Sequence, residues 1–430
     1  MTTTDVTREA MSSFIRDTGG SVAAQLEACT RCGICADACH FYQATGNPDF
    51  VPIWKVELLQ KAYRQQFTLF GRLRTAIGVE KRIDDEAIEQ WSRLVYEACT
   101  VCNKCSLVCP MGIDIGPLIF DIRKGMSAAG MVPEDLRDLT RKQLEEGSPL
   151  GVTDEVFADR LDWISDEWDI DLPLDKADAD TLVVFSSIEI MKFPDNLAAV
   201  ARILNAAGEN WTLSSTGREV VDFAFFEGSP EHMKILLNRV LGAARDLDVK
   251  RIIVTECGHA YEALRWVGPD LVDYPEDLEV VHITGLMSQY VKSGRIKLRP
   301  GGLDGEGPIT YHDSCKIQRL GGYIDDPREL LGIMAPESFV DMTPSREQSI
   351  CCGGGGGVNS IKAADANRRA VFRLKVDQLH ATGAKTVVMS CSNCRLNFLD
   401  GVDQYNVPVE IKGLAGLVAD SLATEPAQNN

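Results

Sequence analysis

Thirteen of the fourteen cysteines in the chain fall into three groups whose spacing could bind metal. Two groups near the N-terminus share the spacing C-x2-C-x2-C-x3-C, and the third combines a single cysteine, an adjacent pair followed by glycine, and a C-x-x-C pair. The groups are Cys29, Cys32, Cys35 and Cys39; Cys99, Cys102, Cys105 and Cys109; and Cys315, Cys351, Cys352, Cys391 and Cys394. Cys257 stands outside all three.

The two N-terminal runs have the spacing of bacterial two-cluster ferredoxins. In that spacing, three thiolates two residues apart bind one 4Fe-4S cube and the fourth binds the other cube. The sequence therefore predicts two cubane clusters close enough to exchange electrons, one on Cys29, Cys32, Cys35 and Cys109 and one on Cys99, Cys102, Cys105 and Cys39. Zinc favours two separated C-x2-C pairs, and disulfide frameworks belong to small secreted domains, so both alternatives fit these runs poorly.

Length and charge narrow the class of protein. The 430 residues are enough for about two or three domains. A net charge of −19, from 63 acidic and 44 basic side chains, argues against a nucleic-acid partner. No segment reaches the roughly 18 consecutive apolar residues of a membrane-spanning helix, and the N-terminus lacks a signal-peptide pattern. We therefore expect a cytoplasmic protein that reaches a membrane only through a partner.

The N-terminal third carries a helical pattern. Between the two cysteine runs, apolar side chains recur every three or four residues, as in WKVELLQKAYRQQFTLFGRL and DDEAIEQWSRLVYEAC. Residues 1–135 are therefore predicted to form a helical ferredoxin domain, followed by an acidic helical linker over residues 136–179. The aromatic and basic stretch 63–74 is either a partner-docking face or the ordinary core-packing face of an amphipathic helix.

From about residue 180 the pattern changes to short apolar runs separated by amphipathic helices, which predicts an α/β fold. The runs are TLVVFSS, RIIVTE, LEVVHIT, ITYHDS, KTVVMSC and VPVEIKG. They also repeat: RIIVTECGH echoes KTVVMSCSNC, and HITGLMSQYV echoes EIKGLAGLVA. The predicted fold class is α + α/β, with two copies of one α/β domain at 180–300 and 301–422 and a flexible tail at 423–430.

The third cysteine group lies in the second copy, at predicted strand ends and loops. Ligands of α/β sheets gather at the carboxyl ends of the strands, so the five thiols are expected to converge. Five thiolates exceed the four of an ordinary cube, and an adjacent cysteine pair can straddle two irons. Gly353 and Gly354, which follow the pair, would let the backbone approach a cofactor closely.

This part of the chain resembles the CCG-domain family, typified by the catalytic subunit of heterodisulfide reductase, through the motif C-x35-CCG-x38-C-x-x-C. The whole chain resembles fusions of a helical ferredoxin subunit with a CCG subunit. Such fusions include heterodisulfide reductase D-type proteins and the catalytic iron–sulfur subunit of the membrane complex associated with dissimilatory sulfite reductase, to which CGICADACHFYQATGNPDFVP is similar.

The resemblance implies a function. It places a noncubane 4Fe-4S cluster on Cys315, Cys351, Cys352, Cys391 and Cys394 and implies a thiol–disulfide oxidoreductase of sulfur or energy metabolism. The implied partner is a flavoprotein of the heterodisulfide reductase type or a membrane cytochrome b, and the substrate is a free or protein-bound disulfide, thiol or persulfide. The alternatives are the iron–sulfur electron-transfer subunit of a flavin-dependent 2-hydroxyacid or glycerol-3-phosphate dehydrogenase, and a pure electron relay.

The first copy lacks the family's cysteines, so it is expected to hold no cluster. Cys257 and His259 remain there as candidates for a transient thiol partner and a proton donor, or else as a buried cysteine and a loop histidine. His312, close to Cys315, could supply a proton or bond to a cluster sulfur. His40 could tune its neighbouring cluster or be a neutral substitution.

Overall fold

The computed structural model describes residues 3–16, 19–219 and 223–423 and divides the chain into two compact units. Each unit is built from three separate segments of the chain. The first consists of Met1–Thr140, Phe223–Glu231 and Cys351–Leu374, and the second of Arg141–Asp222, His232–Ile350 and Lys375–Asn430. The domain boundaries proposed from sequence remain predictions, and residues 424–430 of the expected tail lie outside the described residues.

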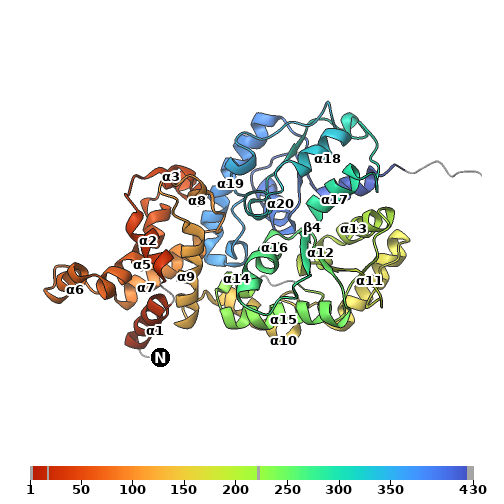
Figure 1. Ribbon diagram of the computed structural model, residues 1–430. Helices are drawn as coiled ribbons and strands as arrows, with labels where there is room; N and C mark the ends of the chain where they lie inside the picture. The colour runs from red at the N-terminus through yellow and green to blue at the C-terminus, as the bar shows by residue number, and fades with distance from the viewer. Residues whose placement is uncertain (1–2, 17–18, 220–222, 424–430) are drawn as a thin grey trace, which may run out of the picture. The chain divides into compact units, whose positions relative to one another are not determined.

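The first unit is helical (Figure 1). Its helices are α1 (Thr3–Arg16), α2 (Gly20–Ala28), α3 (Ile34–Ala38), α4 (His40–Thr45), α5 (Pro52–Phe67), α6 (Leu69–Ala76), α7 (Asp85–Glu97), α8 (Lys104–Leu107), α9 (Ile115–Ala128) and α14 (Phe223–Glu227). In α7, the Asp84 carboxylate caps the helix by accepting from the Ala87 N–H at 3.1 Å. Ile88, Trp91 and Val95 then form the buried stripe of this helix.

Three helices contain the points at which the chain passes between the units: α10 (Glu134–Glu146), α15 (Pro230–Asp246) and α19 (Asp365–Thr382). The predicted acidic linker thus forms α10 and, in the second unit, α11 (Asp154–Trp168). No helix in the described part of the chain is long and apolar enough to cross a membrane.

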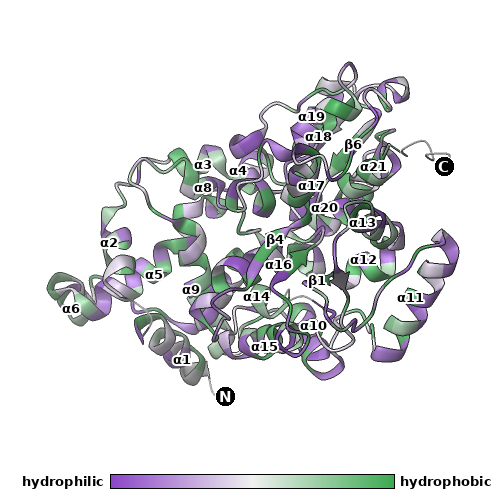
Figure 2. Cartoon of the chain, turned by 45° about the vertical axis from the view of Figure 1, so that its right-hand side comes forward, coloured by the Kyte–Doolittle hydropathy of each residue, from purple (hydrophilic) through white to green (hydrophobic). Residues whose placement is uncertain are grey.

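The second unit contains two parallel sheets. The first has the strand order β2-β1-β3-β4 and the second the order β5-β6-β7. The strands are β1 (Thr181–Val184), β2 (Trp211–Thr212), β3 (Arg251–Val254), β4 (Glu279–His282), β5 (Ile309–Tyr311), β6 (Thr386–Met389) and β7 (Glu410–Gly413). β4 and β6 stand out as hydrophobic in Figure 2, as expected for buried parallel strands.

Helices and turns follow the strands, so that each loop after a strand lies at the carboxyl edge of its sheet. They are α12 (Ser187–Lys192), α13 (Pro194–Ala206), α16 (Gly258–Glu262), α17 (Ile283–Lys292), α18 (Asp326–Met334), α20 (Ser392–Gln404) and α21 (Leu414–Asp420), with π-helical turns at Ala263–Val267 and Lys316–Leu320. One buried apolar cluster packs both sheets and their helices together. The helical N-terminal region and the two parallel sheets confirm the predicted α + α/β fold class.

Candidate functional site

The two N-terminal cysteine runs adopt the same backbone conformation. Arg31 and Val101 have φ angles of 55° and 51°, and Gly33 and Asn103 have φ angles of 85° and 60°. A short helix, α3 or α8, begins directly after the second residue of each pair. Because both pairs are spaced along the chain as the cysteines are, the structure contains one thiol-presenting loop twice.

The first quartet, Cys29, Cys32, Cys35 and Cys109, lines one cavity of the first unit. Burial raises the pKa of Cys35, a backbone hydrogen bond at Ile53 opposes the rise, and the negative charges of the other three thiolates add to it. The structure therefore brings together the four cysteines that the crossed spacing grouped, including Cys109 from the second run.

The second quartet is Cys39, Cys99, Cys102 and Cys105, which line another cavity. Burial raises the pKa of Cys105 well above its ordinary value, and the other three thiolates raise it further. Lys55 lowers it: its ammonium group is buried 3.8 Å from Cys39 Sγ. Each quartet offers four thiols around one cavity, and the second adds a buried cation, so both donor sets fit a 4Fe-4S cluster.

The adjacent pair Cys351 and Cys352 also belongs to the first unit, where Cys351 lies against the second quartet. The Thr100 hydroxyl is 3.5 Å from Cys351 Sγ and 3.4 Å from His40 Nε2. His40 Nδ1 is in turn 4.0 Å from Cys102 Sγ. The pKa of Cys102 is raised mainly by its hydrogen bond with Cys351. The pair and a thiol of the second quartet are therefore in direct contact.

The glycines after the pair, Gly353–Gly357, form a loop that holds both thiols. The N–H groups of Gly353 and Gly354 donate to Cys351 Sγ and Cys352 Sγ, each at 3.5 Å. At Gly356 (φ +62°), a Cβ would lie 2.8 Å from the carbonyl carbon of Thr100. Only glycine therefore lets the loop approach the second cysteine run this closely.

Arg123 joins three segments of the first unit and was not identified from the sequence. Its guanidinium is fully buried and donates to the carbonyls of Val95, Cys99, Phe226 and Gly356 at 2.8 to 3.2 Å. One side chain thus ties the start of the second cysteine run to the glycine loop and to α14.

Cys315, Cys391 and Cys394, the other three cysteines of the third group, lie in the second unit. Cys315 is buried after β5, and Cys391 and Cys394 are buried after β6, at the N-terminus of α20. A hydrogen bond with Cys394 lowers the pKa of Cys391 despite burial, and backbone N–H groups, including that of Gly258, also lower it. Cys391 is thus held as a ready thiolate at the carboxyl edge of the second sheet.

Next to these thiols, the structure leaves buried polar atoms without protein partners. Among the described residues, neither ring nitrogen of His312 nor the hydroxyls of Thr310 and Ser314 has a hydrogen-bond partner. The His312 ring is buried against Phe398, with ring centroids 4.7 Å apart, and burial holds its pKa well below the usual range. Unpaired buried groups are costly, so this set fits a site that binds a further group.

The Glu256–His259 segment of the first sheet lies beside the C-x-x-C segment of the second. The Ser392 N–H donates to the Glu256 carbonyl at 2.7 Å. Cys257 caps α16, and both Cys257 and His259 are buried. Their proposed roles as thiol partner and proton donor remain predictions.

Comparisons with known proteins agree with this arrangement. Residues 28–114 match the family model "4Fe-4S dicluster domain", and residues 309–399 match "Cysteine-rich domain" (CCG). The chain is 26% identical to the Hdr-like menaquinol oxidoreductase iron–sulfur subunit of Archaeoglobus profundus, over 92% of this chain and 79% of the relative. It is 27% identical to the D-type subunit of the dihydromethanophenazine:CoB–CoM heterodisulfide reductase of Methanosarcina mazei, over 93% and 95%. The chain is a heterodisulfide reductase-like iron–sulfur protein.

The EtfAB:quinone oxidoreductase of Syntrophomonas wolfei is a further relative, 26% identical over 90% of this chain and 57% of its own length. These findings confirm the resemblance seen in the sequence, and they make this heterodisulfide reductase-like protein an iron–sulfur oxidoreductase subunit that transfers electrons. Sequence reasoning missed Lys55, Thr100 and Arg123, because only tertiary packing buries them next to the cysteines. The position of Thr100 directly after Cys99 was the one available signal.

Proposed function

We propose that this chain makes or breaks S–S bonds at a noncubane 4Fe-4S cluster held by Cys315, Cys351, Cys352, Cys391 and Cys394, with electrons relayed through two cubane clusters on the two quartets. The observation that carries the proposal is the contact of Cys351 with Cys102 and Thr100. It gives electrons a short route from the second quartet to the adjacent cysteine pair.

The match to the CCG family supports a single site for the five cysteines. The matched residues, 309–399, include all five, although the pair belongs to one compact unit and the other three to the other. A family model that spans both sets favours one binding site assembled from both.

The side chains have separate roles in this proposal. The bound cluster would supply the electrons and an iron that takes the substrate sulfur. The N–H groups of Gly353 and Gly354 stabilise negative charge on the adjacent pair, and the lowered pKa of Cys391 keeps that ligand ionised. Splitting a disulfide consumes two electrons and two protons, and neutral His312 is placed to move one of those protons.

The names of the relatives support a redox partner and a sulfur substrate. One relative is named for menaquinol and another for a heterodisulfide. We infer that this chain exchanges electrons with a membrane cytochrome b subunit or a flavoprotein of the heterodisulfide reductase type, and that its substrate is a disulfide, thiol or persulfide.

The test is iron and acid-labile sulfide per chain in anaerobically purified protein, with Mössbauer spectroscopy to separate cubane from noncubane iron. We expect about twelve irons per chain, a third of them noncubane. Cys352→Ser should retain about eight irons, all cubane. The matched control, Cys257→Ser, removes a buried cysteine outside the three groups and should keep the wild-type spectrum.

Turnover of a small disulfide by the reduced wild-type protein, and its loss in Cys352→Ser, would complete the test. Only about eight cubane irons in a fully loaded wild-type chain would contradict the proposal and leave an electron relay.

A further inference from the structure

Helix α6 presents large apolar side chains to solvent. It follows α5 after Thr68, whose hydroxyl accepts from the Gly71 N–H at 3.1 Å and caps the helix. Leu69, Phe70 and Ile77 are 78%, 76% and 64% exposed. Phe67, Leu73 and Val79 are also exposed, so the apolar surface continues on both sides of the helix.

The orientation of α6 is the reverse of that of an ordinary surface helix. At about 100° per residue, Leu69, Leu73, Ile77 and Phe70 fall within an arc of about 100°, and Gly71 lies on the opposite side. Gly71 is buried, and a Cβ there would lie 2.1 Å from the carbonyl oxygen of Arg64 at the end of α5. The small face therefore packs inward and the apolar face outward. Of the two interpretations of stretch 63–74, core packing does not describe this helix.

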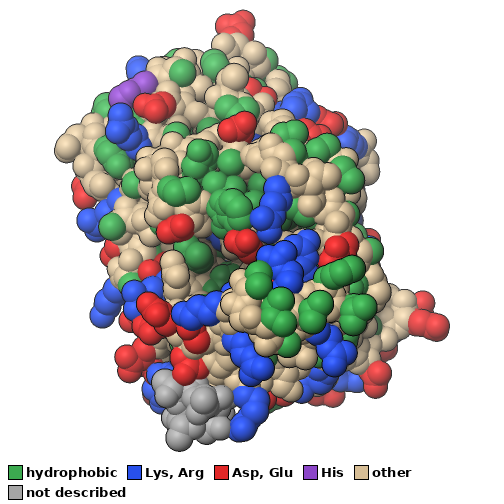
Figure 3. All heavy atoms as spheres, turned by 90° about the vertical axis from the view of Figure 1, so that its left-hand side faces the viewer, with side chains coloured by type: hydrophobic (Ala, Val, Ile, Leu, Met, Phe, Trp, Pro, Cys, Tyr) green, Lys and Arg blue, Asp and Glu red, His purple; other side chains and the backbone are tan. Residues whose placement is uncertain are grey.

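Basic side chains border the apolar arc. On the same projection, Arg72 lies beyond one edge and Arg74 beyond the other. Residues 61–82 contain six basic side chains and one acidic side chain, in a chain of net charge −19. Arg72 is exposed and has no ion-pair partner among the described residues. Figure 3 shows hydrophobic and basic side chains gathered on this side of the molecule, and Figure 2 shows both hydropathic extremes on α6.

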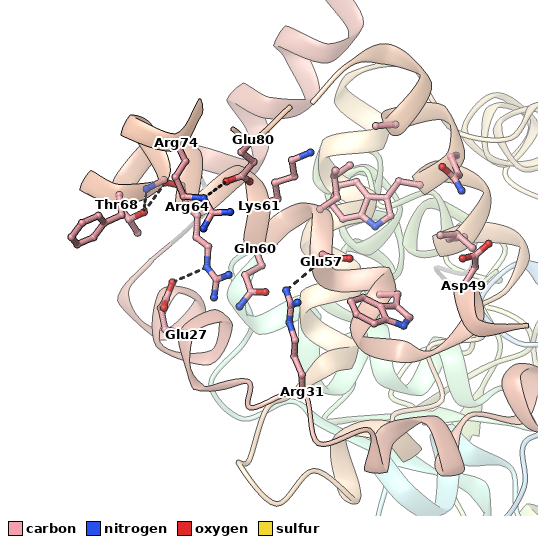
Figure 4. Close-up of a pocket in the computed structure, with 18 of the residues that line it drawn as sticks. Glu27, Arg31, Asp49, Glu57, Gln60, Lys61, Arg64, Thr68, Arg74 and Glu80 are labelled. Carbon is pink, nitrogen blue, oxygen red and sulfur yellow. Dashed lines mark hydrogen bonds and ion pairs between the residues drawn. The ribbon is translucent and has the colours of Figure 1, made fainter. Parts of the chain in front are cut away.

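The hollow between α5 and α6, shown in Figure 4, is a weaker candidate for a charged ligand. Its arginines face carboxylates of the hollow itself: Arg31 with Glu57 at 3.3 Å, Arg64 with Glu27 at 3.5 Å and Arg74 with Glu80 at 4.0 Å. These pairs neutralise the hollow, so the outward apolar face is the feature that lacks an occupant.

We propose that α6 and the turn that follows it, through Val79, bind the surface of a lipid membrane that carries anionic headgroups. The apolar arc enters the boundary between headgroups and acyl chains, and Arg72 and Arg74 extend to the lipid phosphates. Anionic lipid repels the acidic remainder of the chain, so this basic segment sets the orientation of binding. The sequence had suggested membrane contact only through a partner; the exposed face supports direct contact.

The proposal concerns lipid binding alone and does not rest on disulfide chemistry. The test is co-sedimentation of the anaerobic, cluster-loaded full chain with vesicles of phosphatidylcholine alone or of phosphatidylcholine and phosphatidylglycerol. We expect binding to the anionic vesicles that weakens with added salt. Arg72→Gln with Arg74→Gln should lower the partition coefficient by roughly tenfold or more. Leu69→Gln with Phe70→Gln and Leu73→Gln should abolish detectable binding.

Matched controls change the same kinds of side chain elsewhere. Arg93→Gln with Arg141→Gln removes two exposed arginines and gives the same net charge, and Ile235→Gln with Trp266→Gln removes exposed apolar side chains of the second unit. Both controls should bind vesicles as the wild type does. All variants should keep the wild-type circular dichroism and iron content, because the changed side chains are exposed.

A second measurement places the helix in the lipid. Phe70→Trp fluorescence should shift to the blue and be quenched by brominated acyl chains when anionic vesicles are added. Wild-type protein that stays in the supernatant with anionic vesicles, or α6 variants that bind as tightly as their controls, would overturn the proposal. So would loss of binding to a purified partner protein in α6 variants without any vesicle binding by the wild type, which would assign α6 to a protein interface.

Discussion

The two parallel sheets of the second unit end in opposite kinds of chemistry at their carboxyl edges. After β1, the buried Glu189 carboxylate accepts from the Ser186 N–H and hydroxyl, the Asn196 amide and the Glu256 N–H, at 2.8 to 3.1 Å. After β5, both nitrogens of buried His312 lack a partner among the described residues. The first edge is closed by its own hydrogen bonds, and the second is left to be completed by a further group.

This difference separates inheritance of a fold from inheritance of a site. Both edges lie at the ends of parallel strands, where α/β proteins place ligands. In the first sheet, a glutamate network occupies that place and leaves Cys257 as its one cysteine. In the second sheet, thiols and unpaired polar atoms occupy it. If the comparison is correct, changes at the first edge should affect stability, and changes at the second should affect metal content and turnover.

The largest expected effect is the loss of metal from the second edge. Cys391→Ala should remove the noncubane iron, about four of about twelve irons per chain, and abolish disulfide turnover. Cys257→Ala, the corresponding change at the first edge, should leave both unchanged. Iron analysis and Mössbauer spectra check the pair, and equal iron loss in the two variants would break the comparison.

A large loss of stability is expected at the first edge. Glu189→Ala leaves three or more buried donors without an acceptor and should lower the free energy of unfolding by roughly 3–5 kcal/mol. Glu189→Gln should cost less, because its amide oxygen still accepts. Urea unfolding measures the change, with exposed Glu231→Ala as the control. Iron per folded chain should stay at the wild-type value in all three; iron loss would assign Glu189 to the metal site.

His312→Leu should separate function from stability. It removes two unpaired buried nitrogens, so the melting temperature should stay unchanged or rise. Disulfide turnover should fall by about a hundredfold if the imidazole moves a proton. A cluster that keeps its Mössbauer signature while turnover falls would support the proton-transfer role. A lowered melting temperature with normal turnover would make His312 a structural residue.

The smallest effect concerns pH. Burial raises the pKa of Glu256 to about 8, Arg395 opposes the rise and Glu189 adds to it. The folded state then holds a proton that the unfolded state has lost, so stability falls as pH rises from about 4.5 to about 8. Between pH 5 and pH 7 the loss is on the order of 2 kcal/mol. Glu256→Gln should remove this slope in urea titrations at several pH values, and an unchanged slope would locate the titration elsewhere.

Local pattern predicted most of the regular structure. All six apolar runs picked out as strands form strands, and the stretches between the cysteine runs form helices. β2 was missed because its two residues, Trp211 and Thr212, are too few to show a periodicity. The cysteine groups also emerged from spacing alone, because thiols two residues apart on one loop meet wherever that loop lies.

The sequence by itself thus determined the helical and α/β classes, the grouping of the thiols and the relationship to heterodisulfide reductase-type proteins. Only tertiary structure decided which charged side chains are buried and which apolar ones are exposed. Lys55 and Arg123 look like surface residues in the sequence, yet they lie among the second quartet and the glycine loop. Leu69 and Phe70 look like core residues, yet they face solvent. Burial depends on contacts between segments far apart in the chain, and spacing along the chain does not record such contacts.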